Sequence, residues 1–133
     1  MRFMLLVRST KDSEAGVVPE KEIFTAMARY NEDLAKAGVL LVAEGLHPSS
    51  KGARVKFSGS NRTVVDGPFT ETKELIAGFW MIEVKSREEA IEWARRCPAP
   101  FKGEAEIEVR QAFGMDDYAE LIPNEPSPSS AKT

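Results

Sequence analysis

The chain has 133 residues, 42% hydrophobic and 29% charged, which is the composition of one ordinary globular domain. Its 18 Lys and Arg against 21 Asp and Glu give a formal charge of −3 without a long run of either sign, so we expect no nucleic-acid partner. One histidine and one cysteine exclude an intrachain disulfide and multi-His or multi-Cys metal sites, and we expect neither a metal nor a cofactor.

The first half of the chain predicts a strand, a helix and a strand. Residues 3–7 are apolar at both odd and even positions, which point to opposite faces of a strand. This indicates a central strand covered on both faces. After a loop at residues 9–18, Pro19 suits the first position of a helix whose apolar residues recur every three or four positions until Gly38 ends it. Residues 39–46 predict the second strand. The first apolar run is too short for a secretion signal or a membrane span, so we expect a cytoplasmic protein without a membrane partner.

The second half predicts a hairpin, a strand, a helix and a strand: residues 54–57 with 62–65, 75–84, 87–97 and 105–113. Ser86 and Glu89 form a capping box at the start of the helix, and Pro98 ends it. Residues 114–122 are expected to pack as an arm, which completes a domain at residues 1–122. Residues 123–133 are rich in Pro and Ser and are expected to be disordered.

This order of elements predicts an α+β fold of the ferredoxin-like split-βαβ kind with an inserted β-hairpin. The sheet is expected to be mostly antiparallel, with both helices on one face. The other face stays bare, although several strands are apolar on both sides, and large exposed apolar patches usually mark interfaces. A second copy in a two-fold homodimer is the simplest cover.

The most distinctive motif is Asp66-Gly67-Pro68-Phe69, with Glu71, Lys73 and Glu74 after it. With it, the chain resembles the DGPF branch of the YCII-related family, also at residues 2–6, 37–39, 44–48, 78–79, 92–98 and 106–110. The resemblance covers residues 1–113. It implies a dimeric, α/β-barrel-like assembly of ferredoxin-like units, a function that is uncertain, and homologues encoded beside or fused to extracytoplasmic-function sigma factors.

The chain also departs from this family. Better-characterised relatives use a histidine near the start of the first helix and an aspartate after the second, and one relative is associated with removing chloride from an aromatic compound. Here residues 20–23 are Glu-Lys-Glu-Ile and residues 97–100 are Cys-Pro-Ala-Pro. That acid–base pair therefore does not carry over to this chain.

Asp66 and His47 are the candidate catalytic residues. A carboxylate at a strand end can accept a proton, and the ordinary pKa of histidine lies near 6.5, which suits a general base in a loop. The structural alternative for Asp66 is stronger: it caps its turn through a side-chain oxygen while Phe69 fills the core. The alternative for His47 is a solvated loop residue.

Arg110, Glu108 and Lys73 are the candidate ligand-binding residues. Glu108 and Arg110 alternate, with Glu106, on the face that a dimer would bury, and buried charges must be paired or line a wet cavity. An ion-pair cluster is the equal alternative for this set. Lys73 can hold an anion or simply be solvated. Cys97 lies on an apolar helical stripe, and we expect a core thiol with a raised pKa rather than a nucleophile.

The sequence thus predicts a homodimer that binds a small polar metabolite in a cleft between the sheet face and residues 47–74. Two alternatives remain open. One is an acid–base enzyme of the lyase or hydrolase kind, with Asp66 and His47 as proton carriers and Arg110 holding an anionic group. The other is a non-catalytic accessory module linked to sigma-factor regulation.

Overall fold

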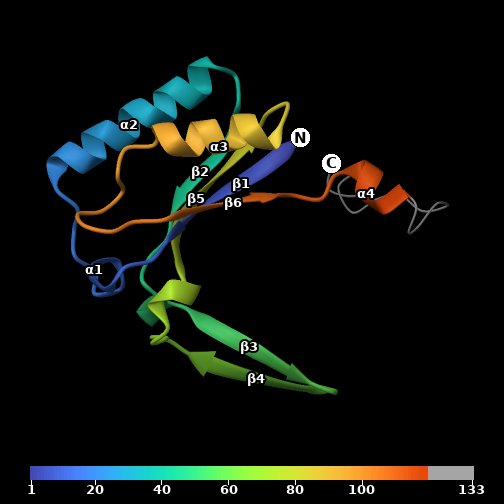
Figure 1. The fold of residues 1–133 in the computed structure, drawn as a ribbon. Coiled ribbons are helices and arrows are strands. Elements are labelled where there is room, and N and C mark those ends of the chain that lie inside the picture. Colours follow the sequence, from blue (N-terminus) through green and yellow to red (C-terminus); the bar gives the residue numbers. More distant parts are fainter. Residues whose placement is uncertain (120–133) are drawn as a thin grey trace.

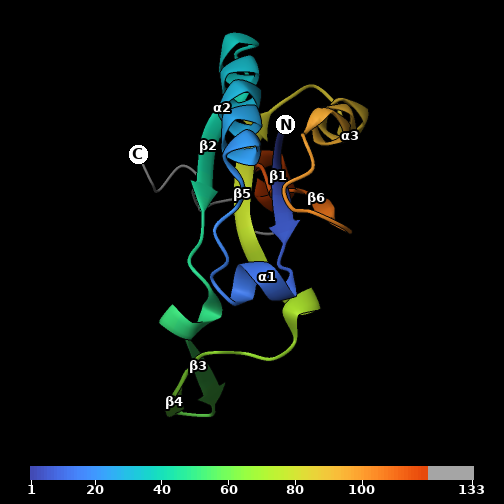
Figure 2. The same ribbon diagram turned by 90° about the vertical axis from the view of Figure 1, so that its left-hand side faces the viewer.

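The computed structural model describes residues 1–119, and the predicted tail at residues 123–133 lies outside them. The main sheet has four antiparallel strands in the order β2-β5-β1-β6. Their bounds are Arg2–Arg8 for β1, Leu40–Gly45 for β2, Ile76–Glu83 for β5 and Ile107–Gln111 for β6. Helices α2 (Lys21–Lys36) and α3 (Arg87–Arg96) lie on one face of this sheet (Figures 1 and 2). This arrangement is the predicted split-βαβ topology, with β1 and β5 in the centre.

The helix ends follow local chemistry, with small differences from prediction. Gly38 has φ +74° and ends α2, as expected. Glu20, rather than the residue before Pro19, is the N-cap, so the proline lies two residues before the first helical residue, Lys21. Residues 9–18 are not a plain loop, because Thr10 caps a one-turn helix, α1 (Lys11–Glu14). The side chain of Ser86 accepts a hydrogen bond from the Glu89 backbone at 3.1 Å, which confirms the predicted cap of α3.

The core lies between the helices and the sheet. On β1 the residues alternate strictly, and Phe3, Leu5 and Val7 are the buried set. Tyr30 of α2 packs edge-on against Trp80 of β5, with ring centroids 5.2 Å apart. Other core residues are Leu34, Val39, Ile82, Val84, Ala90 and Trp93. The Tyr30 hydroxyl donates to the Trp93 carbonyl at 2.6 Å, which joins the two helices inside the core.

Among residues 1–119, no long helix packs against the opposite face of the sheet. The strand register places Met4 and Leu6 of β1 beside Met81 and Phe79 of β5 on this face, where all four are half-buried. Among the described residues, α2 and α3 both lie on the other side of the sheet from these four side chains (Figure 1). We call this surface the open sheet face.

The predicted hairpin is confirmed, and it forms a separate two-stranded sheet. Strands β3 (Ala53–Ser58) and β4 (Asn61–Asp66) pair in register from Ala53 with Asp66 to Ser58 with Asn61. The hairpin projects beyond the end of the main sheet, on the side away from the helices (Figures 1 and 2). Two single 3₁₀ turns, Ser49–Lys51 and Thr72–Glu74, flank it in the chain.

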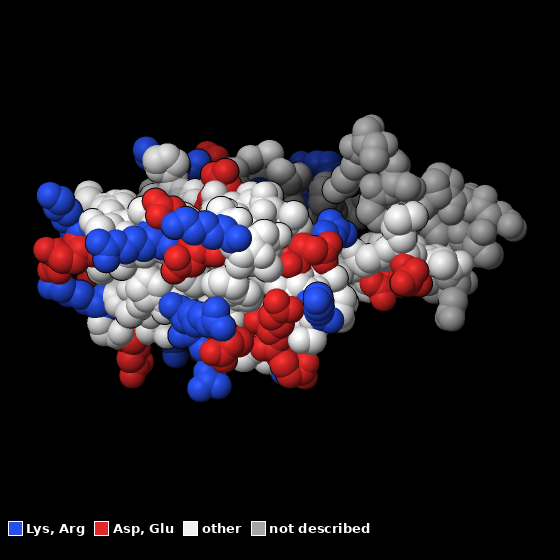
Figure 3. Space-filling model, turned by 90° about the horizontal axis from the view of Figure 1, so that it is seen from above, with Lys and Arg blue, Asp and Glu red and all other residues white. Residues whose placement is uncertain are grey.

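The outer surface of the helices carries acidic and basic side chains in a mixed pattern, without a patch of one sign (Figure 3). This is the polar side of two amphipathic helices whose apolar stripes face the sheet. In the part of the chain that the structure describes, no helix has both the length and the apolar character needed to cross a bilayer. A last short helix, α4 (Met115–Ala119), follows β6.

Candidate functional site

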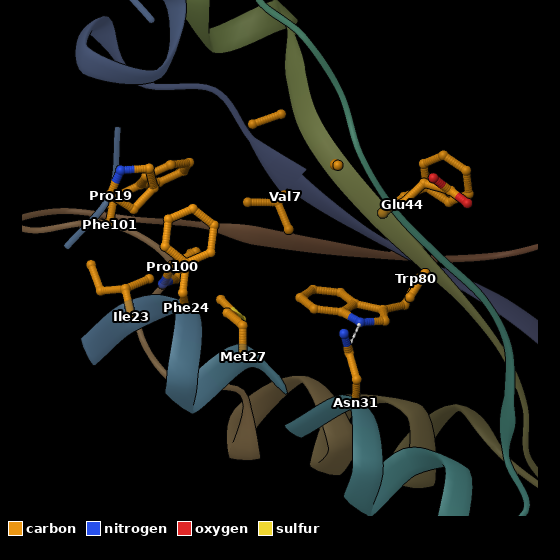
Figure 4. Close-up of a pocket in the computed structure, with 15 residues that line it drawn as sticks. Val7, Pro19, Ile23, Phe24, Met27, Asn31, Glu44, Trp80, Pro100 and Phe101 are labelled. Atoms are coloured by element: carbon orange, nitrogen blue, oxygen red, sulfur yellow. Dashed lines mark hydrogen bonds between the residues drawn. The ribbon is translucent and has the colours of Figure 1, made fainter. Parts of the chain in front are cut away.

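A groove on the helix side lies between the first half of α2 and the end of the sheet where β2 and β5 meet (Figure 4). Its inner part has a volume of about 330 Å³, within the range of small-molecule sites. Its lining is mainly apolar: Val7, Pro19, Ile23, Phe24, Met27, Ala43, Trp80, Pro100 and Phe101. The inner wall of the groove is therefore mainly hydrophobic.

The sequence builds this groove from the stripe of α2 and from two loops. Ile23 and Met27 are four residues apart, so both face the sheet from one side of the helix. Phe24 points toward the same space, and its side chain is 56% exposed. Phe101, in the loop after α3, lies beside Pro19 at the end of the groove away from Trp80.

Asn31 supplies the polar group at the inner end. The Trp80 Nε1–H donates to Asn31 Oδ1 at 2.7 Å (Figure 4). Because an indole nitrogen can only donate, this bond fixes which end of the amide faces Trp80. The Asn31 Nδ2 group has no acceptor among the described residues. Its N–H donors are thus available to a ligand in an otherwise apolar space.

The groove continues outward into a wider chamber of about 560 Å³. Pro19, Phe24 and Phe101 line both parts, and His47 and Pro48 belong to the outer wall. The predicted candidate His47 is therefore placed, exposed, at the outer end of the groove. Glu44, also in contact with the inner part, has its side chain on the other side of the sheet edge (Figure 4).

A third hollow, of about 250 Å³, lies at the rim beside Pro19 and Phe101. There Lys102 forms an ion pair with Glu20, and the hydrogen bond and charge of this carboxylate raise the pKa of the Lys102 ammonium. The rim of the groove thus carries an exposed ion pair.

Asp66 lies apart from this groove. It ends β4 with an exposed side chain, which accepts no hydrogen bond from another described residue and has no polar contact with His47. The alternative that Asp66 caps its turn therefore finds no bond to support it. The structure does not bring the two predicted catalytic side chains together.

Other atoms hold the turn at residues 66–69. The Gly67 N–H donates to the Gly52 carbonyl at 2.9 Å, and a Cβ at this position would collide with the Ser49 carbonyl, so only glycine fits. The Phe69 N–H donates to Ser49 Oγ at 3.0 Å, and Ser49 in turn donates its N–H and hydroxyl to the Glu14 carboxylate. The distinctive motif is thus anchored to α1 through one serine.

The prediction that Phe69 fills the core is wrong. Its ring is half-buried at the turn and lies under the Arg54 guanidinium, which is 3.8 Å from the ring centroid. The main core is closed by α2 and α3, on the far side of the sheet from the hairpin. Phe69 therefore stabilises the base of the hairpin.

The other three predicted residues lie around the open sheet face. Glu108 contacts Arg8 through one carboxylate oxygen and Arg110 through the other, each at 3.3 Å. Arg8 also donates to the backbone carbonyl of Lys73. This is the ion-pair alternative, and it includes an arginine that the sequence analysis did not select. The alternation of the strand could have identified Arg8, because it lies on the same face of β1 as the other even-numbered residues, and Glu108 lies on that face too.

Lys73 itself is exposed and lines a polar hollow of about 450 Å³ with Arg8, Glu104 and Glu106. The structure thus distributes the five predicted site residues over three places: the groove, the end of β4 and the open sheet face. Asn31 was missed, although a polar residue four positions after Met27 on an apolar stripe is a readable signal.

Cys97 is partly buried against the core at the end of α3, as predicted. Burial raises the pKa of its thiol to about 12, which is the predicted direction with desolvation as the cause. Within residues 1–119, no group of three or more His, Cys, Asp or Glu side chains is arranged to hold a metal ion.

Three comparisons relate the chain to known proteins. The model of the YCII-related domain matches residues 1–112. An uncharacterized protein, R00369, of Rhizobium meliloti (strain 1021) is 30% identical over 91 residues, which are 68% of this chain and 73% of the relative. A solved structure of 5-chloro-2-hydroxyhydroquinone dehydrochlorinase from Burkholderia phenoliruptrix AC1100, in complex with 2,5-dihydroxybenzoquinone, is similar with a TM-score of 0.42 at 18% identity, covering 86% of this chain and 96% of that one. A likeness this distant transfers no activity to this chain.

Proposed function

The chain belongs to the YCII-related family, and from the geometry of its own groove we propose that it binds a small, mainly apolar molecule bearing a hydrogen-bond acceptor beside α2. The observation that carries this proposal is the Asn31 amide. Its oxygen is occupied by Trp80, while its N–H donors face an apolar space. A ligand carbonyl, ether or hydroxyl oxygen placed there can accept a hydrogen bond from these donors.

The volume supports a ligand of one or two rings, or an aliphatic molecule of similar size. A cavity of ~150 Å³ holds benzene, and the inner groove has about twice that volume. The aromatic rings of Phe24, Trp80 and Phe101 offer flat contact surfaces for such a ligand.

The groove is a better candidate than the sheet face that the sequence analysis favoured for a polar metabolite. Both carboxylate oxygens of Glu108 are already paired with arginines, and the cavities described above include neither Glu108 nor Arg110. An apolar wall with one oriented donor pair recognises a different ligand class from a charged cluster.

The test compares two probes that differ in one acceptor: acetophenone and ethylbenzene, observed by ligand-detected NMR. We expect acetophenone to bind the protein several-fold more tightly than ethylbenzene. In Asn31→Asp the carboxylate still accepts from the Trp80 indole but offers no donor, so the preference for the ketone should disappear. Met27→Trp should fill the groove and weaken both probes. If the Asn31→Asp variant preferred acetophenone over ethylbenzene as strongly as the unaltered protein does, the proposed role of the amide would be contradicted.

A second candidate function is acid–base catalysis in the same groove, supported by the position of His47 on its outer wall. A proton carrier at this place can reach a ligand whose acceptor is held at the inner end. His47→Gln should then leave probe binding unchanged and abolish turnover of a bound substrate. Unchanged turnover in that variant would exclude His47 as the proton carrier and would contradict this second function.

A further inference from the structure

The outer chamber of the groove gathers exposed apolar side chains. Val17, Val18 and Leu46 line this chamber but not the inner groove, and they are 55%, 77% and 45% exposed in that order. We call these three residues the outer apolar cluster. Single exposed apolar residues are ordinary on a protein surface, whereas several around one hollow mark a binding site. A ligand confined to the inner end, beside Asn31, would leave the cluster uncovered.

Backbone hydrogen bonds hold the outer apolar cluster in place. The Val17 N–H donates to the Asp12 carbonyl at 3.0 Å, directly after Gly16 turns the chain with φ +78°. The Leu46 N–H donates to the Ala77 carbonyl at 2.8 Å, which continues the pairing of β2 with β5 beyond the end of the strand. The exposure of these side chains is therefore built into the fold.

The cluster lies on the path of a ligand whose acceptor is held at Asn31. Pro19, Phe24 and Phe101 line both the inner groove and the outer chamber, so a chain that leaves the groove passes between them. Phe24 precedes Asn31 by seven residues of α2, which is about 10 Å along the helix axis at ~1.5 Å per residue. An extended alkyl chain advances ~1.25 Å per bond, so about eight carbons cover this distance.

The walls of the outer chamber suit an apolar chain better than a charged group. Among the described residues that line it, none is an Asp, Glu, Lys or Arg. Ser13 and His47 carry the polar side chains of the wall, and the Ser13 hydroxyl already donates to the Thr10 carbonyl at 3.0 Å. The ion pair of Glu20 with Lys102 lies in the separate hollow at the rim. A carbon chain in the chamber therefore gains apolar contact without displacing a charge from water.

We propose that the ligand of the groove is elongated, with an oxygen acceptor at the Asn31 amide and an apolar chain of about eight to twelve carbons that passes Phe24 and covers the outer apolar cluster. This inference rests on the proposed function and narrows its ligand class to medium-chain aliphatic molecules with a carbonyl, ether or hydroxyl oxygen near one end. The inner groove binds the oxygen, and the outer chamber binds the end of the chain.

Two methyl ketones of different length test the chain. Beyond the carbonyl, 2-heptanone extends ~6 Å and stays in the inner groove, whereas 2-undecanone extends ~11 Å and enters the chamber. Complete burial of one methylene tightens binding about fourfold, and the chamber is partly open to solvent. In competition with acetophenone, observed by ligand-detected NMR, we expect 2-undecanone to bind about tenfold to a hundredfold more tightly than 2-heptanone.

A pair of valine substitutions separates the chamber from general hydrophobicity. Val17→Ser with Val18→Ser should weaken 2-undecanone about fivefold or more and leave 2-heptanone unchanged, because the short chain does not reach these residues. The matched control is Val55→Ser with Val64→Ser, two valines of similar exposure on the β3–β4 hairpin, which should change the affinity of neither ketone. All four side chains are exposed, so circular dichroism should show folded protein in both variants.

Equal affinities of the two ketones, or a 2-undecanone affinity that the Val17 and Val18 pair does not lower, would overturn this inference and leave the proposed function standing. Asn31→Asp gives the opposite case: unchanged binding of 2-heptanone in that variant would contradict the proposed function itself. If the Val17 and Val18 pair lowered the mass seen by light scattering and changed neither ketone affinity, the cluster would be a protein interface, and the elongated ligand would be excluded.

Discussion

Replacing Ser49 by alanine tests which atoms hold the turn at residues 66–69. The change removes the hydroxyl that donates to Glu14 and accepts from the Phe69 N–H, leaving a carboxylate and a backbone donor with one partner fewer each. A net neutral hydrogen bond contributes ~0.5–1.5 kcal/mol and one to a charged group ~1.5–3 kcal/mol. The junction is half-buried, so water replaces part of the loss, and we expect a destabilisation of about 2 kcal/mol.

For a domain of this length, that loss corresponds to a melting temperature lower by about 6–10 °C. Urea unfolding followed by circular dichroism measures the free energy directly. The matched control is Asp66→Ala, which should change stability by less than ~0.5 kcal/mol because no described residue donates to that carboxylate. Gly67→Ala should cost more than Ser49→Ala, since its Cβ meets the Ser49 carbonyl. This account would be refuted if Ser49→Ala left the free energy of unfolding unchanged while Asp66→Ala lowered it. Asp66 would then be the residue that holds the turn.

Two further predictions concern the core. Tyr30→Phe should lower the free energy of unfolding by about 1–2 kcal/mol in urea titrations, because the buried Trp93 carbonyl loses its donor; an unchanged midpoint would show that the bond contributes nothing. Cys97 should make the protein less stable as pH rises above 9, because the unfolded thiol ionises near its ordinary pKa of 9.0 while burial keeps the folded thiol protonated until about 12. Cys97→Ala should flatten the decline of the urea midpoint between pH 9 and 11, and an identical decline would contradict this cause.

The elements could be predicted from the sequence because their signals are local. The cap of α3 needs only Ser86 and Glu89, three residues apart, and the end of α2 needs only Gly38. The apolar residues on both faces of β1 and β5 likewise predict the central place of these two strands in the sheet. Errors at this level, such as the position of Pro19 or the ends of β6, amount to at most two residues.

The candidate site depends on contacts between distant segments, and spacing does not reveal these. Asn31 acquires its role from Trp80, 49 residues later, and the groove is lined by Phe101 from a third segment. The motif at residues 66–69 attracted attention as a source of catalysis. Its unusual residues instead satisfy a close backbone approach to Ser49, which no pattern within the motif discloses.

The two consecutive residues Tyr30 and Asn31 both hold the Trp80 ring, one by an edge-on contact in the core and the other by a hydrogen bond in the groove. A single indole therefore forms the boundary between the packed interior and the ligand space. Any movement that enlarged the groove at this wall would have to open the core against Tyr30. The inner end of the groove is consequently rigid and selects ligands by their shape. Ligands of different length are accommodated by the exposed Phe24 and the outer chamber.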